Sequence, residues 1–206
     1  MKIIIISGTP KKEGGTQSFV TAALETARAS GADAEVISLP DRNLITCKMC
    51  GDGWGICFKQ YRCAFGNEDG DGFNALQETL SSADAFIWIT PVYWGQASEA
   101  VKNFIDRLRR CQGSKYYNWG DTSGLSILQN KPSILTAVAG GGGGGIANTF
   151  QEMERAITFM GGDIWPRAAS GFFDYIAVNP WNQEYKREAL CAAVTALVKR
   201  LEMPAN

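Results

Sequence analysis

The feature that most constrains the fold is a regular alternation of short apolar runs with longer amphipathic segments. The first run, residues 2–7, is rich in isoleucine and ends in Gly8, which is typical of a strand buried on both faces. Further strands are predicted at residues 34–39, 85–90 and 132–139 and within 164–173. Helical spacing of apolar residues predicts helices at 16–29, 72–82, 98–111, 149–160 and 183–201, with Ser98 as a cap.

Alternation of this kind favours right-handed crossovers and a mostly parallel sheet covered by helices on both faces. Five strands suit the flavodoxin-like order 2-1-3-4-5. We therefore expect an α/β three-layer sandwich with a five-stranded parallel sheet, built as one domain over residues 1–206. A cysteine-rich insertion at about residues 41–70 interrupts the pattern after the second strand.

Composition excludes several classes of protein. Twenty basic and 21 acidic residues leave a net charge of −1, which gives no basic surface for nucleic acid or an anionic membrane. The chain has no histidine, which excludes Ser-His-Asp and Cys-His catalysis and histidine-ligated zinc or haem. The N-terminal apolar run is too short for a signal peptide or a membrane span, so we expect a cytoplasmic protein, where disulfides are disfavoured.

Three unusual loops follow the first, third and fourth predicted strands, at the edge of the sheet where ligands of such folds bind. The loop GTPKKEGGT offers Thr9, Lys11, Thr16 and a helix N-terminus, which favour a phosphate; a solvated turn is the alternative. The loop PVYWGQA offers aromatic rings for a planar ligand, or for ordinary packing. Residues 140–145 are all glycine, which allows close approach of a flat ligand or gives a flexible loop.

Four of the six cysteines are clustered as C-x2-C-x6-C-x5-C, at Cys47, Cys50, Cys57 and Cys63. Four thiolates suit an iron–sulfur cluster, and a single C-x2-C pair favours such a cluster over zinc. Unligated thiols, with a reversible disulfide between Cys47 and Cys50, are the remaining alternative. The other two cysteines lie in predicted helices and are expected in the core.

The stretches SGTPKKEGGT and ADAFIWITPVYWGQASEAVKNFIDR, with the cysteine cluster between them, resemble the flavodoxin-like NADPH-dependent FMN reductase superfamily and its iron–sulfur flavoprotein branch. The resemblance implies that the FMN phosphate binds at Thr9, Lys11, Gly15, Thr16 and Gln17. It implies that the isoalloxazine contacts Pro91, Val92, Tyr93, Trp94, Gly95, Gly140, Gly141 and Gly142. It also implies a [4Fe–4S] cluster on Cys47, Cys50, Cys57 and Cys63.

The sequence departs from that family pattern in the phosphate loop and in the cysteine spacing. In the loop, Thr9 stands where the family usually has serine and Gly15 where it has asparagine, while Thr16 is retained. Lys11 stands where the family's phosphate loop usually has arginine, so the bidentate fork is lost. The branch usually has C-x2-C-x2-C-x5-C, and four additional residues separate Cys50 from Cys57 here.

We therefore predict an FMN-dependent oxidoreductase that passes electrons between a [4Fe–4S] cluster and FMN. The alternatives are an NAD(P)H-dependent FMN or quinone reductase without a cluster, and an electron carrier or zinc-stabilised module that is not an enzyme. The expected partners are an electron donor or acceptor, either a protein or a small molecule such as NAD(P)H, and further copies in a homodimer or homotetramer. The long connection 112–131 is predicted to be a lid, an interaction segment or a plain surface loop.

Overall fold

The computed structural model describes residues 1–68, 70–120, 124–165 and 176–203. Its strands are β1 (Lys2–Ser7), β2 (Asp33–Ser38), β3 (Ala85–Tyr93), β4 (Gln96–Ala97), β5 (Pro132–Ala139), β6 (Asp163–Ile164) and β7 (Ile176–Val178). Its helices are α1 (Gly15–Ala29), the 3₁₀ turn η1 (Leu39–Asp41), α2 (Cys57–Gln60), α3 (Phe73–Ser81), α4 (Glu99–Tyr116), α5 (Ile146–Phe159) and α6 (Gln183–Glu202). None of these helices is long and apolar enough to cross a membrane.

The sheet confirms the predicted α/β class and the order of its main strands. Its path is β2-β1-β3-β5-β6, and each of these neighbouring pairs is parallel. The predicted count of five strands is wrong, because the described part of the sheet has seven. One additional strand is β4, which pairs antiparallel with the end of β3 as a short hairpin.

The other additional strand arises because two separate segments, β6 and β7, both pair with β5 at the edge of the sheet. Asp163 of β6 pairs with Pro132, and Ile176 of β7 pairs with Thr136 of the same strand. The two partners in β5 are four residues apart, whereas Asp163 and Ile176 are thirteen residues apart. The edge segment therefore contains additional residues between its two pairings. Most of the predicted strand at 164–173 lies outside the described residues.

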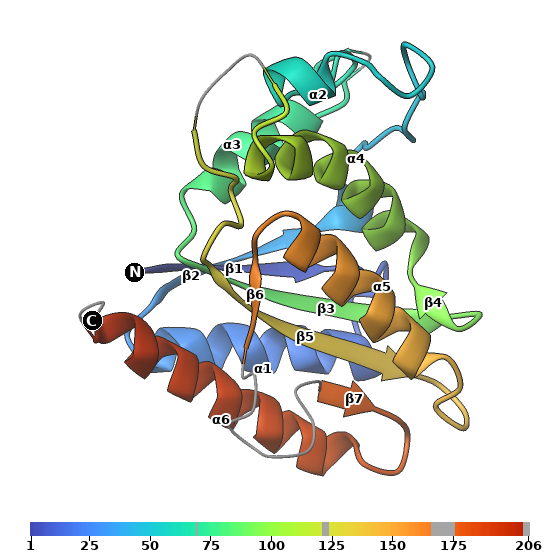
Figure 1. The fold of residues 1–206 in the computed structure, drawn as a ribbon. Helices are drawn as coiled ribbons and strands as arrows, with labels where there is room; N and C mark the ends of the chain where they lie inside the picture. The colour runs from blue at the N-terminus through green and yellow to red at the C-terminus, as the bar shows by residue number, and fades with distance from the viewer. Residues whose placement is uncertain (69, 121–123, 166–175, 204–206) are drawn as a thin grey trace.

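Helices cover both faces of the sheet, as Figure 1 shows. Alternate isoleucines of β1 point to opposite faces: Ile3 and Ile5 pack with residues of α1 and α6, and Ile4 and Ile6 with residues of α3, α4 and α5. All four are at most 1% exposed. The uninterrupted apolar run is therefore explained by two cores, one on each side of the sheet.

The cysteine-rich insertion lies on the outer side of α4, away from the sheet (Figure 1). Three side chains of α4 donate hydrogen bonds to backbone carbonyl oxygens of the insertion: Asn103 to Leu44 (2.9 Å), Arg107 to Ile45 (3.0 Å) and Arg110 to Gly53 (2.8 Å). These residues are spaced by four and three positions, which places them on one face of the helix. Helix α4 therefore packs on the sheet with one face and holds the insertion with the other.

A buried ion pair fixes the middle of this contact. Arg107 lies 2.7 Å from Asp71, with side-chain exposures of 2% and 0%. The guanidinium also stacks 4.1 Å from the ring centroid of Phe73, whose N–H donates to the Asp71 carboxylate. The pair joins α4 to the start of α3, at the end of the insertion.

We predict that Asp71→Asn destabilises the protein by about 3–5 kcal/mol, because it leaves the Arg107 charge buried without a carboxylate. Asp106→Asn is the matched control, since Asp106 forms a half-exposed pair with Lys102 on the same helix and such a pair contributes about 0.3–0.5 kcal/mol. Urea unfolding followed by circular dichroism measures both. Equal losses of stability in the two variants would contradict the assigned role of the buried pair.

Candidate functional site

A cavity of about 270 Å³ lies at the carboxyl edge of the sheet. The three predicted loops meet there, after β1, β3 and β5, as the parallel topology requires. The described residues that line it are Thr9, Lys11, Glu13, Gly14, Gly15, Thr16, Pro91, Val92, Tyr93, Val138, Ala139, Gly140, Pro180 and Gln183. Eight of the thirteen residues predicted to hold a cofactor are therefore brought together in one place.

The N-terminus of α1 opens into this cavity. Gly14 precedes the helix with φ 103°, no side chain caps the first turn, and that turn carries no acidic residue. The first backbone bond into the helix runs from the Ser18 N–H to the Gly14 carbonyl, so the preceding N–H groups have no partner within the helix. These donors and the helix dipole favour an anion beside Lys11 and Thr16.

A buried contact joins the first and third loops. The Ser98 hydroxyl donates to the Gly8 carbonyl oxygen (2.8 Å), and the Ser98 N–H donates to the Thr90 hydroxyl (3.1 Å). Ser98 occupies the predicted N-cap position of α4, but its hydroxyl forms this tertiary hydrogen bond and makes no bond to the first turn of the helix. A side chain on Gly8 would begin 2.4 Å from Val101 of α4, so this close approach of the first loop to the start of α4 also requires glycine.

Two residues of the third loop, Trp94 and Gly95, lie outside the cavity lining. Val92 pairs with Ala97 across the hairpin, and the chain reverses at Trp94 (φ 50°) and Gly95 (φ 79°). Two successive positive φ angles are typical of a tight two-residue hairpin turn. The turn presents the Trp94 side chain to solvent, fully exposed, so only the residues before the reversal face the cavity.

The glycine loop contributes less to the lining than predicted. Among the described residues, Gly140 is the only one of the six glycines that lines the cavity, and Gly141 and Gly142 do not. Gly145 has φ 83°, and a side chain there would begin 2.0 Å from the Gly95 Cα. This glycine is therefore required by the close crossing of the third and fourth loops.

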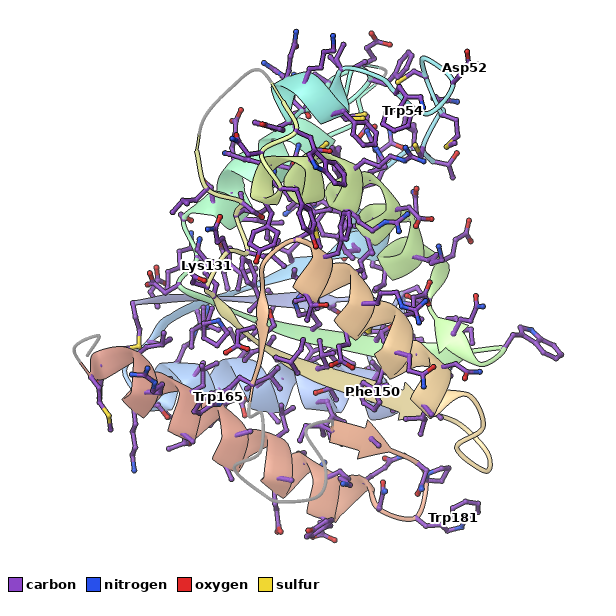
Figure 2. The ribbon with its side chains drawn as sticks, viewed as in Figure 1. Asp52, Trp54, Lys131, Phe150, Trp165 and Trp181 are labelled. Atoms are coloured by element: carbon purple, nitrogen blue, oxygen red, sulfur yellow. The ribbon has the colours of Figure 1, made fainter. Side chains whose placement is uncertain are left out.

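Two further differences come from the helices beside the cavity. Gln17 faces a separate shallow site with Lys12 and Arg187, because successive residues of α1 rotate away from the cavity. Gln183, the first residue of α6, also lines the cavity, and it was not predicted from the sequence. The signal was the position of the loop after the fifth strand, because that loop begins at the same edge of a parallel sheet. Figure 2 shows Trp181 of that loop beyond β7, on the opposite side of the molecule from Trp54.

The predicted metal ligands lie in the insertion, and all four thiols are half-buried. The six residues between Cys50 and Cys57 fold back in a turn, where the Gly53 N–H donates to the Met49 carbonyl and the Trp54 N–H to Gly51. A side chain on Gly55 would begin 2.5 Å from the Cys50 sulfur, so the additional residues bring the chain back beside that thiol.

Two arginines of α4 lie beside these thiols. The Arg107 guanidinium donates to the Cys63 sulfur (3.2 Å). Burial raises the pKa of the Cys57 thiol and Cys50 adds to the rise, while Arg110 lowers that pKa. In the part of the chain that the structure describes, no three Cys, Asp or Glu side chains come close enough to hold a metal ion.

Cys63 is also fixed through its backbone. Its N–H donates to the Asn74 side-chain oxygen (3.0 Å), and its carbonyl accepts from the Asn74 amide (2.9 Å). Asn74 bonds to Gln77, Gln77 to Gln112, and Gln112 to the Ile127 N–H. The predicted connection 112–131 is thus partly helical and tied to the insertion, and none of its described residues lines the cavity at the sheet edge.

Helix α4 separates the cavity from the thiols. Its first residue follows Ser98 at the sheet edge, and Arg107, which contacts Cys63, lies eight residues further, about 12 Å along the axis. The base of the insertion reaches the edge, where Lys12 of the first loop forms an ion pair with Asp41. The cavity and the thiol segment are therefore separate regions of the molecule, one at the sheet edge and the other on the outer face of α4.

The sequence and fold match known flavoproteins. An iron–sulfur flavoprotein of Methanocaldococcus jannaschii is 31% identical over 153 residues, covering 74% of this chain and 69% of that protein. An iron–sulfur flavoprotein of Methanosarcina thermophila is 28% identical, covering 74% and 71%. A flavodoxin, WrbA-like protein from Agrobacterium tumefaciens superposes with a TM-score of 0.56 at 18% identity, covering 96% and 98% of the two chains. The NADPH-dependent FMN reductase profile matches residues 1–168, and the chain belongs to that family.

Proposed function

We propose that this protein is an FMN-dependent oxidoreductase in which the cavity at the sheet edge binds FMN. We further propose that Cys47, Cys50, Cys57 and Cys63 hold a [4Fe–4S] cluster that exchanges electrons with a flavin. The observation that carries the first proposal is the uncapped N-terminus of α1 opening into a cavity with Lys11 and two threonines. The family to which the chain belongs supports the same reading.

The residues of the cavity fit the two ends of FMN. Thr9 is 4% exposed, and its hydroxyl accepts from the Lys11 N–H (3.2 Å), which leaves the hydroxyl proton available to a phosphate oxygen. Thr16 supplies a second hydroxyl at the start of the helix. Tyr93 and the backbone of Val138–Gly140 line the part that would receive a planar ring.

When bound, FMN supplies hydride and single-electron chemistry, and the chain supplies binding and orientation. The first loop holds the phosphate through Lys11, Thr9, Thr16 and the free N–H groups of α1. The Ser98 contact to Gly8 keeps this loop in place against β3. No side chain of the cavity is assigned a proton-transfer role, which agrees with a chain that has no histidine.

The thiol donor set supports the cluster proposal. Four thiolates are the ligands of a [4Fe–4S] cluster, and Arg107 and Arg110 lie where they offset negative charge on sulfur. The two relatives described above are named iron–sulfur flavoproteins. Because metal binding is coupled to folding in such segments, we expect cluster loading to draw the four thiols together.

A cluster-free NAD(P)H-dependent flavin reductase is the second candidate. The observation that favours it is the absence, among the described residues, of three thiols gathered for metal binding. The family description, NADPH-dependent FMN reductase, names such an activity. In this candidate, reduced nicotinamide would pass hydride directly to FMN. Anaerobic reduction of the flavin by NADPH in a preparation without iron would support this candidate.

We predict that Lys11→Ala combined with Thr16→Ala weakens FMN binding by about a hundredfold, because two contacts to a charged phosphate are lost. Lys12→Ala is the matched control, since Lys12 is ion-paired with Asp41 outside the cavity lining. Fluorescence titration measures FMN and riboflavin binding in each protein. If riboflavin binds as tightly as FMN to the unaltered protein, the phosphate site is wrongly assigned.

The glycine loop allows a sharper comparison. Gly140 and Gly142 both lack a positive φ, and a side chain at either would meet no atom of the protein within 4 Å. Both valine variants should therefore fold alike, while only Gly140→Val places a side chain in the cavity lining. We expect Gly140→Val to weaken FMN binding at least about tenfold and Gly142→Val to leave it unchanged, because a branched side chain excludes the ring. Equal affinities in the two variants would argue against a flavin at this edge.

For the cluster, we predict about four irons and four acid-labile sulfides per chain after anaerobic preparation. Alanine at Cys47, Cys50, Cys57 or Cys63 should remove the iron and leave FMN bound, because the thiol segment and the cavity at the sheet edge are separate regions of the molecule. Cys111→Ala and Cys191→Ala should keep both groups, since neither thiol belongs to the insertion. Iron near zero in the unaltered protein would reject the cluster and leave the cluster-free reductase.

A further inference from the structure

The outer end of α4 carries a second cavity that the proposed function does not use. It measures about 190 Å³ and is remote from the cavity at the sheet edge, because it lies at the end of α4 opposite to Ser98. The described residues that line it are Phe58, Arg109, Arg110, Ser114, Trp119 and Phe159. They come from α2, α4, the connection after α4 and the end of α5.

Aromatic faces form much of this cavity. The rings of Phe58 and Trp119 are nearly parallel, 15° apart, with centroids separated by 6.4 Å. Phe159 lies 6.2 Å from Trp119 at 63°, so a third ring closes the side. Trp119 is 55% exposed, although an indole of this size is normally covered in a folded protein. These surfaces suit a flat, apolar ring.

The remaining lining is cationic. Arg109 and Arg110 contribute two guanidinium groups, and no acidic residue is among the described lining residues. Arg110 is held in place by bonds to the Gly53 carbonyl (2.8 Å) and the Met49 sulfur (3.3 Å). The carbonyl oxygens of Gly113 and Ser114, near the end of α4, accept backbone N–H groups of Tyr117 and Trp119, so hydrogen bonds satisfy them. Arginine recognises carboxylates through paired hydrogen bonds.

From these features we infer that this cavity binds a single-ring aromatic anion, such as an aromatic carboxylate. A dry cavity of about 150 Å³ accommodates benzene, so 190 Å³ accommodates one ring with a small acid group. The ring would lie against Phe58 and Trp119, and its charge would face Arg109 and Arg110. Because Phe58 follows Cys57 directly, an occupant would lie next to the thiol segment. The inference does not depend on FMN, because none of the described residues that line this cavity also lines the cavity at the sheet edge.

The test uses benzoate as the probe and benzamide as its neutral counterpart of equal size. Binding is followed through the indole N–H signal of Trp119 in two-dimensional NMR, assigned by its loss in Trp119→Phe. We expect benzoate to shift this signal saturably and benzamide to bind at least about tenfold more weakly, because a charge-assisted contact is absent. The signal of Trp181, exposed on the other side of the sheet, should not move.

Arg109→Gln should weaken benzoate binding at least about tenfold for the same reason. Arg155→Gln is the matched control, because Arg155 lines the adjoining cavity between α4 and α5 but not this one. Equal binding of benzoate and benzamide, unchanged affinity in Arg109→Gln, or an unmoved Trp119 signal would overturn the inference. So would a Trp119 signal that shifts with protein concentration in the absence of benzoate, because a second copy of the chain would then cover the cavity.

Discussion

Burial of the central sheet on both faces is the constraint from which the rest of the structure follows. The isoleucines of β1 fill two cores at once, so each connection between parallel strands must cross over through a helix. All the loops that follow the parallel strands then meet at one edge. This topology brings together the free N–H groups of α1, the end of β3 and the first residue of the glycine loop.

Helix α4 lies between the core of the sheet and the thiol segment. Its inner face packs in the core, and Ser98 at its start ties the first loop to β3. Its outer face carries Arg107 and Arg110, which hold the backbone of the thiol segment and approach its sulfur atoms. Cys111 also belongs to this helix and is 1% exposed; burial raises its pKa, and the charges of Cys57 and Cys63 add to that rise. The cavity at the sheet edge and the thiol segment are therefore separate units, and α4 contacts both regions.

Sequence periodicity predicted the α/β class and the order of the main strands, because burial on two faces leaves a clear apolar signature. It also predicted which three loops meet at the sheet edge. It could not predict the divided fifth position, since the pairing of Asp163 and Ile176 with the same strand depends on tertiary register. Periodicity also could not predict the side-chain directions of Trp94 and Gln17. The direction of Trp94 depends on positive φ angles in a tight turn, and that of Gln17 depends on how α1 is rotated relative to the cavity. Ser98 matched a cap pattern, but a tertiary hydrogen bond determined its actual partner.

Hydrogen exchange measured by mass spectrometry, on the protein without cofactor and after addition of FMN, tests the central claim most directly. If the sheet edge binds FMN, amide protection should rise in residues 8–17, 90–95, 138–141 and 180–184, which hold or adjoin the cavity lining. Residues 44–63, on the outer side of α4, should exchange at the same rate in both states. Protection that appears in residues 44–63 and not in residues 8–17 would contradict the account and place the flavin elsewhere on the molecule.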